Sequence, residues 1–177
     1  IRPEGEAVYR LEGMNSVLIL KKSLEYFASK QALDIDTLGE KNVSALVDSK
    51  LVKDIADIYT LTVDDLLKLD RFAKISPEKL ISAISNKRRP FLNKFIMGLG
   101  IRHVGAQTAS DLADYFKSID ALEDASIEVL EKVDGIGEVV AESIVAWFSD
   151  EDNTALLDKF KSLNIKPTYR EKSSKLL

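Results

Sequence analysis

The sequence predicts an all-α protein built from repeated units, each of which is a pair of helices joined by a tight hairpin. An apolar residue followed by Gly or Ala recurs at positions 38–39, 72–73, 104–105 and 136–137, in steps of 34, 32 and 32 residues. Each pair precedes a run with apolar residues at helical spacing. Ser/Thr caps followed by acidic residues open short helices at Thr62 and Ser126, which lie 64 residues apart. We therefore expect four units in two pseudo-duplicated halves.

The third unit, over residues 95–116, has the clearest pattern. An apolar helical run stops at Gly98 and Gly100, a short segment follows, and a second helical run starts after Gly105. Glycine permits positive φ and close approach of a ligand, and the first amides of a helix carry the positive end of its dipole. A phosphate fits such a helix start without needing a cation. The stretch therefore predicts a phosphate site.

Composition excludes several classes of protein. The 177 residues are 45% apolar and 31% charged, as in a globular chain that is neither disordered nor membrane-spanning. With no Cys and one His, disulfides, thiol catalysis and a Cys-based zinc site are excluded. No segment resembles a signal peptide, so we expect a cytoplasmic location. Residues 1–20 have short alternation with Gly and Pro, which predicts an irregular or β-hairpin segment, and the pattern changes to a helix from Lys21.

Charge is distributed unevenly along the chain. The net charge is −4, but residues 1–103 carry +3 and residues 104–177 carry −7. A basic patch near the third hairpin is the expected polyanion face, although a short basic run is usually just a solvated loop. The basic residues of this predicted patch are Lys87, Arg88, Arg89 and Lys94, and Lys74 near the second hairpin is added to them.

Several hairpins on two symmetric halves could follow both strands of a duplex, contacting phosphates and ignoring sequence. We therefore expect duplex DNA as the partner, even for an acidic chain. His103 has no neighbour that would make it a general base, so we expect it to serve the hairpin. The candidate phosphate-binding residues are Gly39, Glu40, Lys41, Gly100, Arg102, His103, Gly105, Gln107, Thr108, Gly135 and Gly137.

Two other functions fit the same pattern. In the first, the hairpins are only tight turns and the array is a helical module that binds another protein. In the second, the array belongs to a repair nuclease or a junction-binding protein. Falling affinity with salt would separate DNA binding from the protein-interaction module.

Five segments together resemble the C-terminal part of bacterial NAD-dependent DNA ligases. They are EGEA (4–7), FASKQALDI (27–35), LGEK (38–41), GLGIRHVG (98–105) and VDGIG (133–137). The resemblance implies a zinc finger followed by a four-unit helix-hairpin-helix domain of the SAM/RuvA-like kind, which clamps nicked duplex DNA across the minor groove. It further implies upstream adenylation and OB-fold domains and a downstream BRCT domain in a parent enzyme that uses NAD.

On this basis we expect a zinc-finger remnant over residues 1–22, the DNA-binding domain over 23–166 and a linker over 167–177. Leu11 and Ser16 stand where the family has two zinc-ligating cysteines, so no zinc is expected. Thr37 stands in place of a family glycine in the first hairpin, and Arg71 and Ala73 stand in place of the glycines of the second. Because the second hairpin has lost its glycines, the second unit is expected to be mainly structural.

Lys132 matches the KxDG signature of the adenylated lysine of nucleotidyltransferases. The match is a coincidence on our interpretation, because residues 134–137 continue as the fourth hairpin and the signature needs a strand-and-pocket setting. The sequence therefore predicts no catalytic residue in this chain, with NAD serving only the intact enzyme.

Overall fold

The computed structural model describes residues 16–73 and 76–170, and within these ranges helices dominate. The β-type pairing described there is one isolated parallel bridge, between Phe91 and Thr168. The all-α prediction is therefore confirmed. The helices in chain order are residues 16–28, α2 (Glu40–Asp48), η1 (Ile55–Thr60), α3 (Val63–Leu67), η2 (Asp70–Ala73), α4 (Pro77–Ser85), α5 (Leu92–Gly98), α6 (Ala106–Phe116), α7 (Ile119–Glu123), α8 (Ile127–Leu130), α9 (Glu138–Ser149) and α10 (Glu151–Ser162).

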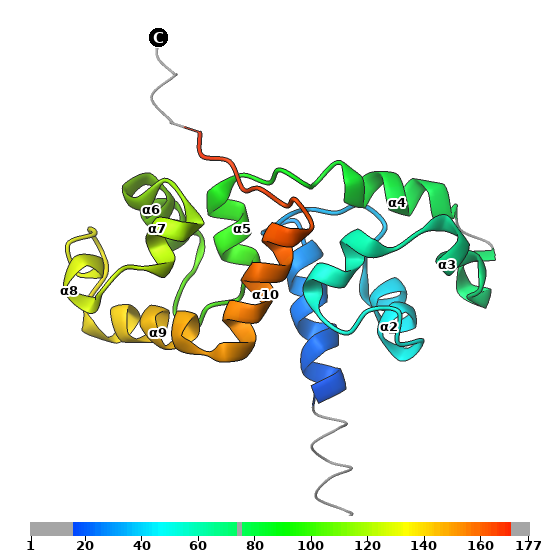
Figure 1. Cartoon of the computed structure of the whole chain (residues 1–177), viewed down its shortest axis with the longest axis horizontal. Helices are drawn as coiled ribbons and strands as arrows, with labels where there is room; N and C mark the ends of the chain where they lie inside the picture. The colour runs from blue at the N-terminus through cyan, green and yellow to red at the C-terminus, as the bar shows by residue number, and fades with distance from the viewer. Residues whose placement is uncertain (1–15, 74–75, 171–177) are drawn as a thin grey trace, which may run out of the picture.

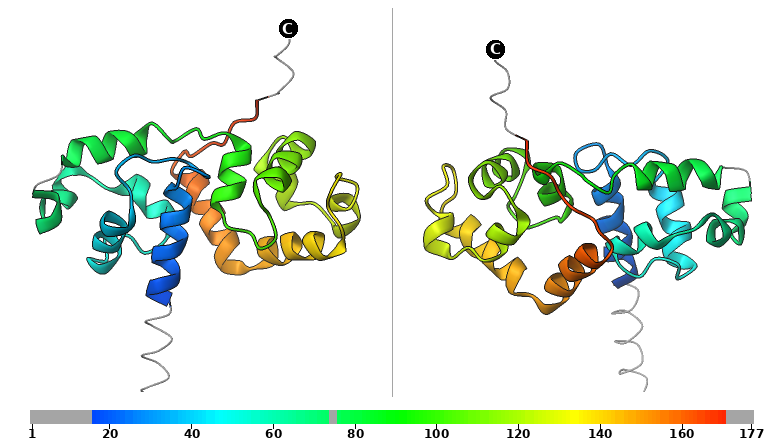
Figure 2. Two further views of the ribbon diagram at one scale, coloured as in Figure 1. Left: turned by 180° about the vertical axis from the view of Figure 1, so that it is seen from behind. Right: turned by 45° about the horizontal axis from the view of Figure 1, so that its top comes forward.

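Two groups of helices flank a central set. The helix over residues 16–28, α5 and α10 lie in the middle, with α2, α3 and α4 on one side and α6 to α9 on the other (Figure 1). The two further views in Figure 2 show the same division. The predicted two-half organisation therefore corresponds to two lateral groups that share a central layer.

The predicted caps at Thr62 and Ser126 are confirmed. The Thr62 hydroxyl accepts from the Asp65 amide, and the Asp65 carboxylate accepts from the Thr62 amide, which is a complete capping box at the start of α3. The Ser126 hydroxyl accepts from the Val129 amide at the start of α8. These local bonds satisfy donors that a helix start otherwise leaves free, so both short helices begin where the sequence indicates.

The irregular N-terminal segment is only partly as predicted. Residues 16–22 are helical and continue into the buried positions Leu24, Phe27 and Ala28. Helix formation is cooperative, so the packed turns at residues 24–28 favour helix in the turns before them, although residues 16–19 are exposed. The prediction of an irregular or hairpin form was therefore wrong for residues 16–20, whereas the helix predicted from Lys21 is confirmed. Residues 1–15 lie outside the described chain.

A cluster of four aromatic rings joins the two halves. Phe160 of α10 stacks on Phe27 at 5.8 Å between ring centroids, and it meets Phe95 of α5 edge-on at 5.1 Å. Tyr59 of η1 completes the cluster at 6.3 Å from Phe160. All four side chains are buried. Because the rings come from four elements, the halves share one core at this point.

The chain's C-terminal segment seals the connection between the halves. The Lys166 amide donates to the Arg88 carbonyl, and the Thr168 amide donates to the Pro90 carbonyl. In return, the Leu92 amide donates to the Thr168 carbonyl at 2.7 Å. Residues 88–92, which link the halves, are thereby held by residues 166–168.

An ion-pair clip also joins the halves. Lys159 Nζ of α10 lies 2.8 Å from Asp54 Oδ2 and also contacts Asp57 Oδ1, both near η1. Burial alone raises the pKa of Asp57, but hydrogen bonds from Lys159 and the Lys53 amide outweigh it and hold the pKa below its ordinary value. For Lys159, burial lowers the pKa, and the hydrogen bonds to the two carboxylates outweigh burial and raise it.

We expect the clip to make stability depend on pH. The Asp57 contribution is present above its unfolded pKa of about 4 and is lost as pH falls through the lower folded value. The Lys159 contribution is present below its unfolded pKa of about 10.4 and is lost as pH rises through the folded value. Lys159→Met should therefore destabilise the protein more at neutral pH than at about pH 3 in urea unfolding. Equal losses at both pH values would contradict this, and exposed Lys166→Met is the control.

Candidate functional site

Three of the four predicted hairpins share one turn geometry: hairpin 1 (residues 35–39), hairpin 3 (residues 101–105) and hairpin 4 (residues 133–137). In each, the amide of the fourth residue donates to the carbonyl of the first, at 3.1 to 3.3 Å. The third residue of each turn has a positive φ, which is the mark of a type II turn. These residues are Thr37 (67°), His103 (70°) and Gly135 (83°).

The last residue of each of these hairpins is a glycine that begins the following helix. The backbone angles (φ, ψ) are −96° and −172° at Gly39, −97° and −167° at Gly105, and −95° and −174° at Gly137. None of the three helix starts has a side-chain cap. The first amides of α2, α6 and α9 therefore stay available to an outside acceptor, with the positive end of the helix dipole behind them.

The fold itself does not require glycine at these three helix starts. Their φ values are ones that any residue adopts, and a Cβ atom added at Gly39, Gly105 or Gly137 would meet nothing within 4 Å. Gly98 is different, because a Cβ there would lie 2.9 Å from the Phe27 ring. Ser, Thr, Asp and Asn cap helices at least as well as Gly, so helix stability does not explain the choice either. The missing side chains leave room for something outside the chain.

The second hairpin departs from this geometry, as its lack of glycines predicted. Its turn is the short 3-10 helix η2, and no residue of η2 has a positive φ. The following helix α4 starts at Pro77, and the Ser76 hydroxyl caps it by accepting from the Lys79 amide. This helix start is therefore satisfied by its own cap, and three of the four predicted units have the open form. The predicted contact Lys74 lies outside the described residues.

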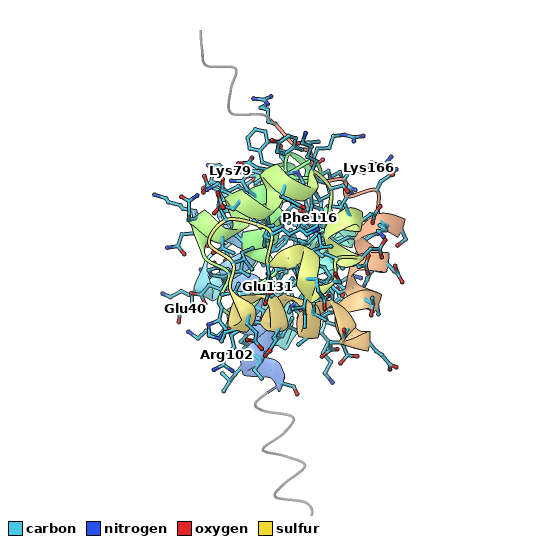
Figure 3. All side chains as sticks on the ribbon, turned by 90° about the vertical axis from the view of Figure 1, so that its left-hand side faces the viewer. Glu40, Lys79, Arg102, Phe116, Glu131 and Lys166 are labelled. Atoms are coloured by element: carbon cyan, nitrogen blue, oxygen red, sulfur yellow. The ribbon has the colours of Figure 1, made fainter. Side chains whose placement is uncertain are left out.

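Hairpin 3 is held by the helix that follows hairpin 4. The Ser143 hydroxyl of α9 donates to the Arg102 carbonyl in hairpin 3 at 2.7 Å. Ser143, which is half-buried, was missed by sequence reasoning because a single serine within a helix carries no signal of its own. Seen from the side in Figure 3, Arg102 of hairpin 3 and Glu40, which follows hairpin 1, project from the same side of the molecule, opposite Lys166.

The first helical residue differs among the three open helix starts. It is Glu40 after hairpin 1 and Glu138 after hairpin 4, whereas it is Ala106 after hairpin 3. A carboxylate at this position interacts favourably with the helix dipole and competes with an incoming anion. Hairpin 3 is therefore the most favourable of the three for an anion.

The other predicted residues around hairpin 3 lie on its surface. Arg102, His103 and Gly105 are exposed, and Thr108 is half-buried in the first turn of α6. Gln107 is exposed, but its side-chain amide already donates to Asp111 Oδ1 at 3.0 Å. Gly100 has a φ of 69° and ends α5, so its role is to let the chain leave the helix.

The predicted basic patch divides into two parts. Lys87, Arg89 and Lys94 line one depression together with Asn86, which precedes them in the chain, and with Lys30, which sequence reasoning missed. Asp34, at the start of hairpin 1, lies at the same depression. Within the described residues these four cations form no ion pair with an acidic side chain. Lys30 follows the helix over residues 16–28, and its approach to residues 86–94 is tertiary, so no local pattern could reveal it.

Arg88 does not belong to this free surface. Its guanidinium donates to the carbonyls of Leu163 and Tyr59 and lies 5.7 Å from the centre of the Tyr59 ring. The side chain is thus engaged inside the seam between the halves. The prediction of Arg88 as part of a free basic patch is corrected accordingly.

We expect mutation of Arg88 to lower the stability of the protein much more than mutation of Arg89. Arg88→Ala leaves two carbonyls without their donor and should cost about 2–3 kcal/mol of unfolding free energy. Arg89→Ala, at an exposed position, should change stability by less than about 0.5 kcal/mol. Urea unfolding of both variants checks this, and similar losses for the two would contradict the division.

The comparisons with known proteins agree with this geometry. The family model described as "Helix-hairpin-helix motif" matches residues 94–157, a range that contains hairpins 3 and 4. Proteins named DNA ligase from Bacillus thuringiensis (strain Al Hakam), Bacillus cereus (strain AH820) and Bacillus anthracis are each 38% identical over 170 residues. The chain is similar to part of a DNA ligase. The match covers 96% of this chain but only 25% of each relative.

Two further observations concern nucleotidyl transfer and membrane insertion. Lys132 is exposed in the turn that leads into hairpin 4, as expected for a chance match to the nucleotidyltransferase signature. Across the described ranges, no helix is long and apolar enough to cross a bilayer. The predicted absence of zinc concerns Leu11, outside the described residues, and Ser16, so it stays a prediction.

Proposed function

We propose that this chain binds duplex DNA, including nicked duplex, through backbone phosphates and without regard to sequence, as part of an NAD-dependent DNA ligase that seals nicks. The observation that carries the proposal is the set of three glycines, Gly39, Gly105 and Gly137, that stand at uncapped helix starts where the fold has no need of them. The similarity to DNA ligases over 96% of the chain supports the same function.

Each open helix start offers backbone amides and a positive dipole end to one phosphate. Because the donors belong to the backbone, the contact needs no basic side chain, which is how a chain of net charge −4 can bind DNA. Hairpin 3 binds most strongly, since Arg102 adds a positive charge and Ala106 leaves the dipole unopposed. The depression lined by Lys30, Lys87, Arg89 and Lys94 extends the contact with ordinary charge.

The chemistry of such a ligase lies outside this chain on our proposal. NAD supplies the AMP group when it is bound by the intact enzyme, and the residues described here hold the duplex in place for that reaction. Lys132 takes no part, because it stands on an exposed turn. A covalent adenylate on Lys132 after incubation of this chain with NAD would overturn that assignment.

The proposal is tested by a titration of nicked duplex DNA at several salt concentrations. Neutralisation of three or more phosphates by Arg102 and by the cations Lys30, Lys87, Arg89 and Lys94 predicts a slope of about −3 or steeper in log K against log salt. Duplexes of unrelated sequence should bind with the same affinity. Absence of binding at low salt, or strong sequence dependence, would contradict the proposal.

A helical protein-interaction module is the second candidate, and one observation favours it. Val17, Leu18 and Ile19 are 41%, 54% and 65% exposed on one helix, which is an apolar surface that a partner could cover. That function predicts no salt-dependent affinity for DNA. The same titration therefore separates the two, whereas a repair nuclease or junction-binding protein would be recognised by tighter binding to a branched than to a nicked duplex.

A further inference from the structure

Hairpin 1 contains a strained residue that something must hold in place. Thr37 has a φ of 67°, which is uncommon and unfavourable for a residue other than glycine, above all for a β-branched one. Its side chain does not supply the compensation, because its buried hydroxyl oxygen has no hydrogen-bond partner within the described residues. The surroundings of the turn must therefore fix this conformation.

A two-step hydrogen-bond relay reaches the turn from the second unit. The side-chain amide of Asn42, on the first turn of α2, donates to the Thr37 carbonyl. Arg71 Nε, from η2, donates to the side-chain oxygen of Asn42. Asn42 is only 7% exposed, so neither of its two polar ends is easily satisfied by water. The relay thus depends on both bonds.

Arg71 occupies a turn position of the repeat that the other hairpins use differently. Arg71 stands two residues before Ala73, where the open hairpins have Thr37, His103 and Gly135. The second unit has thus lost the open turn but uses that position to support the first. The other half has a parallel arrangement, because Ser143 of the fourth unit donates to the Arg102 carbonyl in hairpin 3.

We propose that Arg71 is a positioning residue for DNA binding by hairpin 1: through Asn42 it holds the Thr37 turn, which aims the first amides of α2 at a phosphate. This inference rests on the proposed function of the hairpins. The competing role is direct phosphate contact, because Arg71 is exposed and its terminal nitrogens form no hydrogen bond or ion pair among the described residues. The two roles require different atoms of the side chain.

Two conservative variants separate the roles. Arg71→Gln places an N–H donor at the same chain position as Nε but has no charge. Arg71→Lys keeps the charge but has a methylene group at that position. A positioning role predicts that Arg71→Lys weakens binding of nicked duplex DNA about fivefold, whereas Arg71→Gln stays within about twofold of the wild type. Lys68→Ala, at an exposed position three residues earlier, is the control for loss of one charge.

Asn42→Ala provides the second arm. A positioning role predicts that adding Arg71→Lys to Asn42→Ala causes no further loss, since the relay is already broken. It also predicts an unchanged salt slope in Arg71→Lys. Two results would show direct phosphate contact and overturn the proposal. The first is that Arg71→Lys keeps its affinity while Arg71→Gln loses it. The second is a salt slope smaller by about one in Arg71→Gln than in the Lys68→Ala control. Equal effects of the two Arg71 variants would overturn it as well.

The free protein supplies a readout that does not depend on DNA. The amide signals of Gly39 and Glu40 in a ¹⁵N correlation spectrum should shift in Arg71→Lys and Asn42→Ala but not in Arg71→Gln or Lys68→Ala. Unshifted signals in Arg71→Lys would contradict the relay even if DNA binds. If wild type fails to bind nicked duplex while these shifts occur, the proposed function fails and the bracing of hairpin 1 stands.

Discussion

Gly105→Val is expected to weaken binding of nicked duplex DNA at least about tenfold while lowering the stability of the protein by no more than about 1 kcal/mol, the cost of a poorer N-cap on α6. Two or more amides at the start of α6 would lose a charge-assisted hydrogen bond to phosphate, and such bonds contribute about 1.5–3 kcal/mol each. The fold tolerates the change, because φ at Gly105 is −97° and a Cβ there meets nothing within 4 Å. The dissociation constant at low salt and the urea midpoint, measured on the same preparation, check both parts.

The control for Gly105→Val is Ala121→Val. Ala121 is exposed in the first turn of α7, a helix whose start is capped by Ser118, so the added bulk blocks no free amide. We expect its affinity for DNA to stay near the wild-type value. If Gly105→Val bound DNA as tightly as this control, hairpin 3 would not be the contact.

The other two open hairpins should matter less. Gly39→Val and Gly137→Val block the same kind of helix start, but Glu40 and Glu138 already oppose an anion there. Their effects should therefore be smaller than that of Gly105→Val. Removing the acid tests this explanation independently, because Glu138→Gln should strengthen binding.

The repeat and its hairpins could be predicted from sequence because their determinants are local. Gly39, Ala73, Gly105 and Gly137 recur in steps of 34, 32 and 32 residues, and the loss of glycine at Arg71 and Ala73 marked the second unit as different. Turn chemistry and caps act over four or five residues, so a single sequence contains them.

The rest of the candidate site depends on tertiary structure. The charge of Arg88 suggested a surface contact, yet its guanidinium is directed to carbonyls at residues 59 and 163. Lys30 joins the basic depression from 57 residues away, and Arg71 reaches hairpin 1 across 29 residues. The direction of a side chain over such separations is set by packing of the helices, which no local pattern records.

The largest loss of stability is expected for Phe160→Ala. Phe160 is 2% exposed and contacts the rings of Phe27, Phe95 and Tyr59, which come from both halves. Removing a buried aromatic ring leaves a cavity and costs about 3–5 kcal/mol of unfolding free energy. Urea unfolding measures it, with exposed Phe91→Ala as the control, which should cost no more than about 1 kcal/mol.

Phe160→Ala also tests whether the hairpins act together on DNA. Hairpin 1 lies in one half and hairpins 3 and 4 lie in the other, so the ring cluster sets the distance between their phosphate contacts. If Phe160→Ala stays folded in the absence of urea, loosening of the cluster should lower DNA affinity although no contact residue has changed. Retained affinity with the expected loss of stability would mean that one half binds DNA alone, and Gly39→Val should then have no effect.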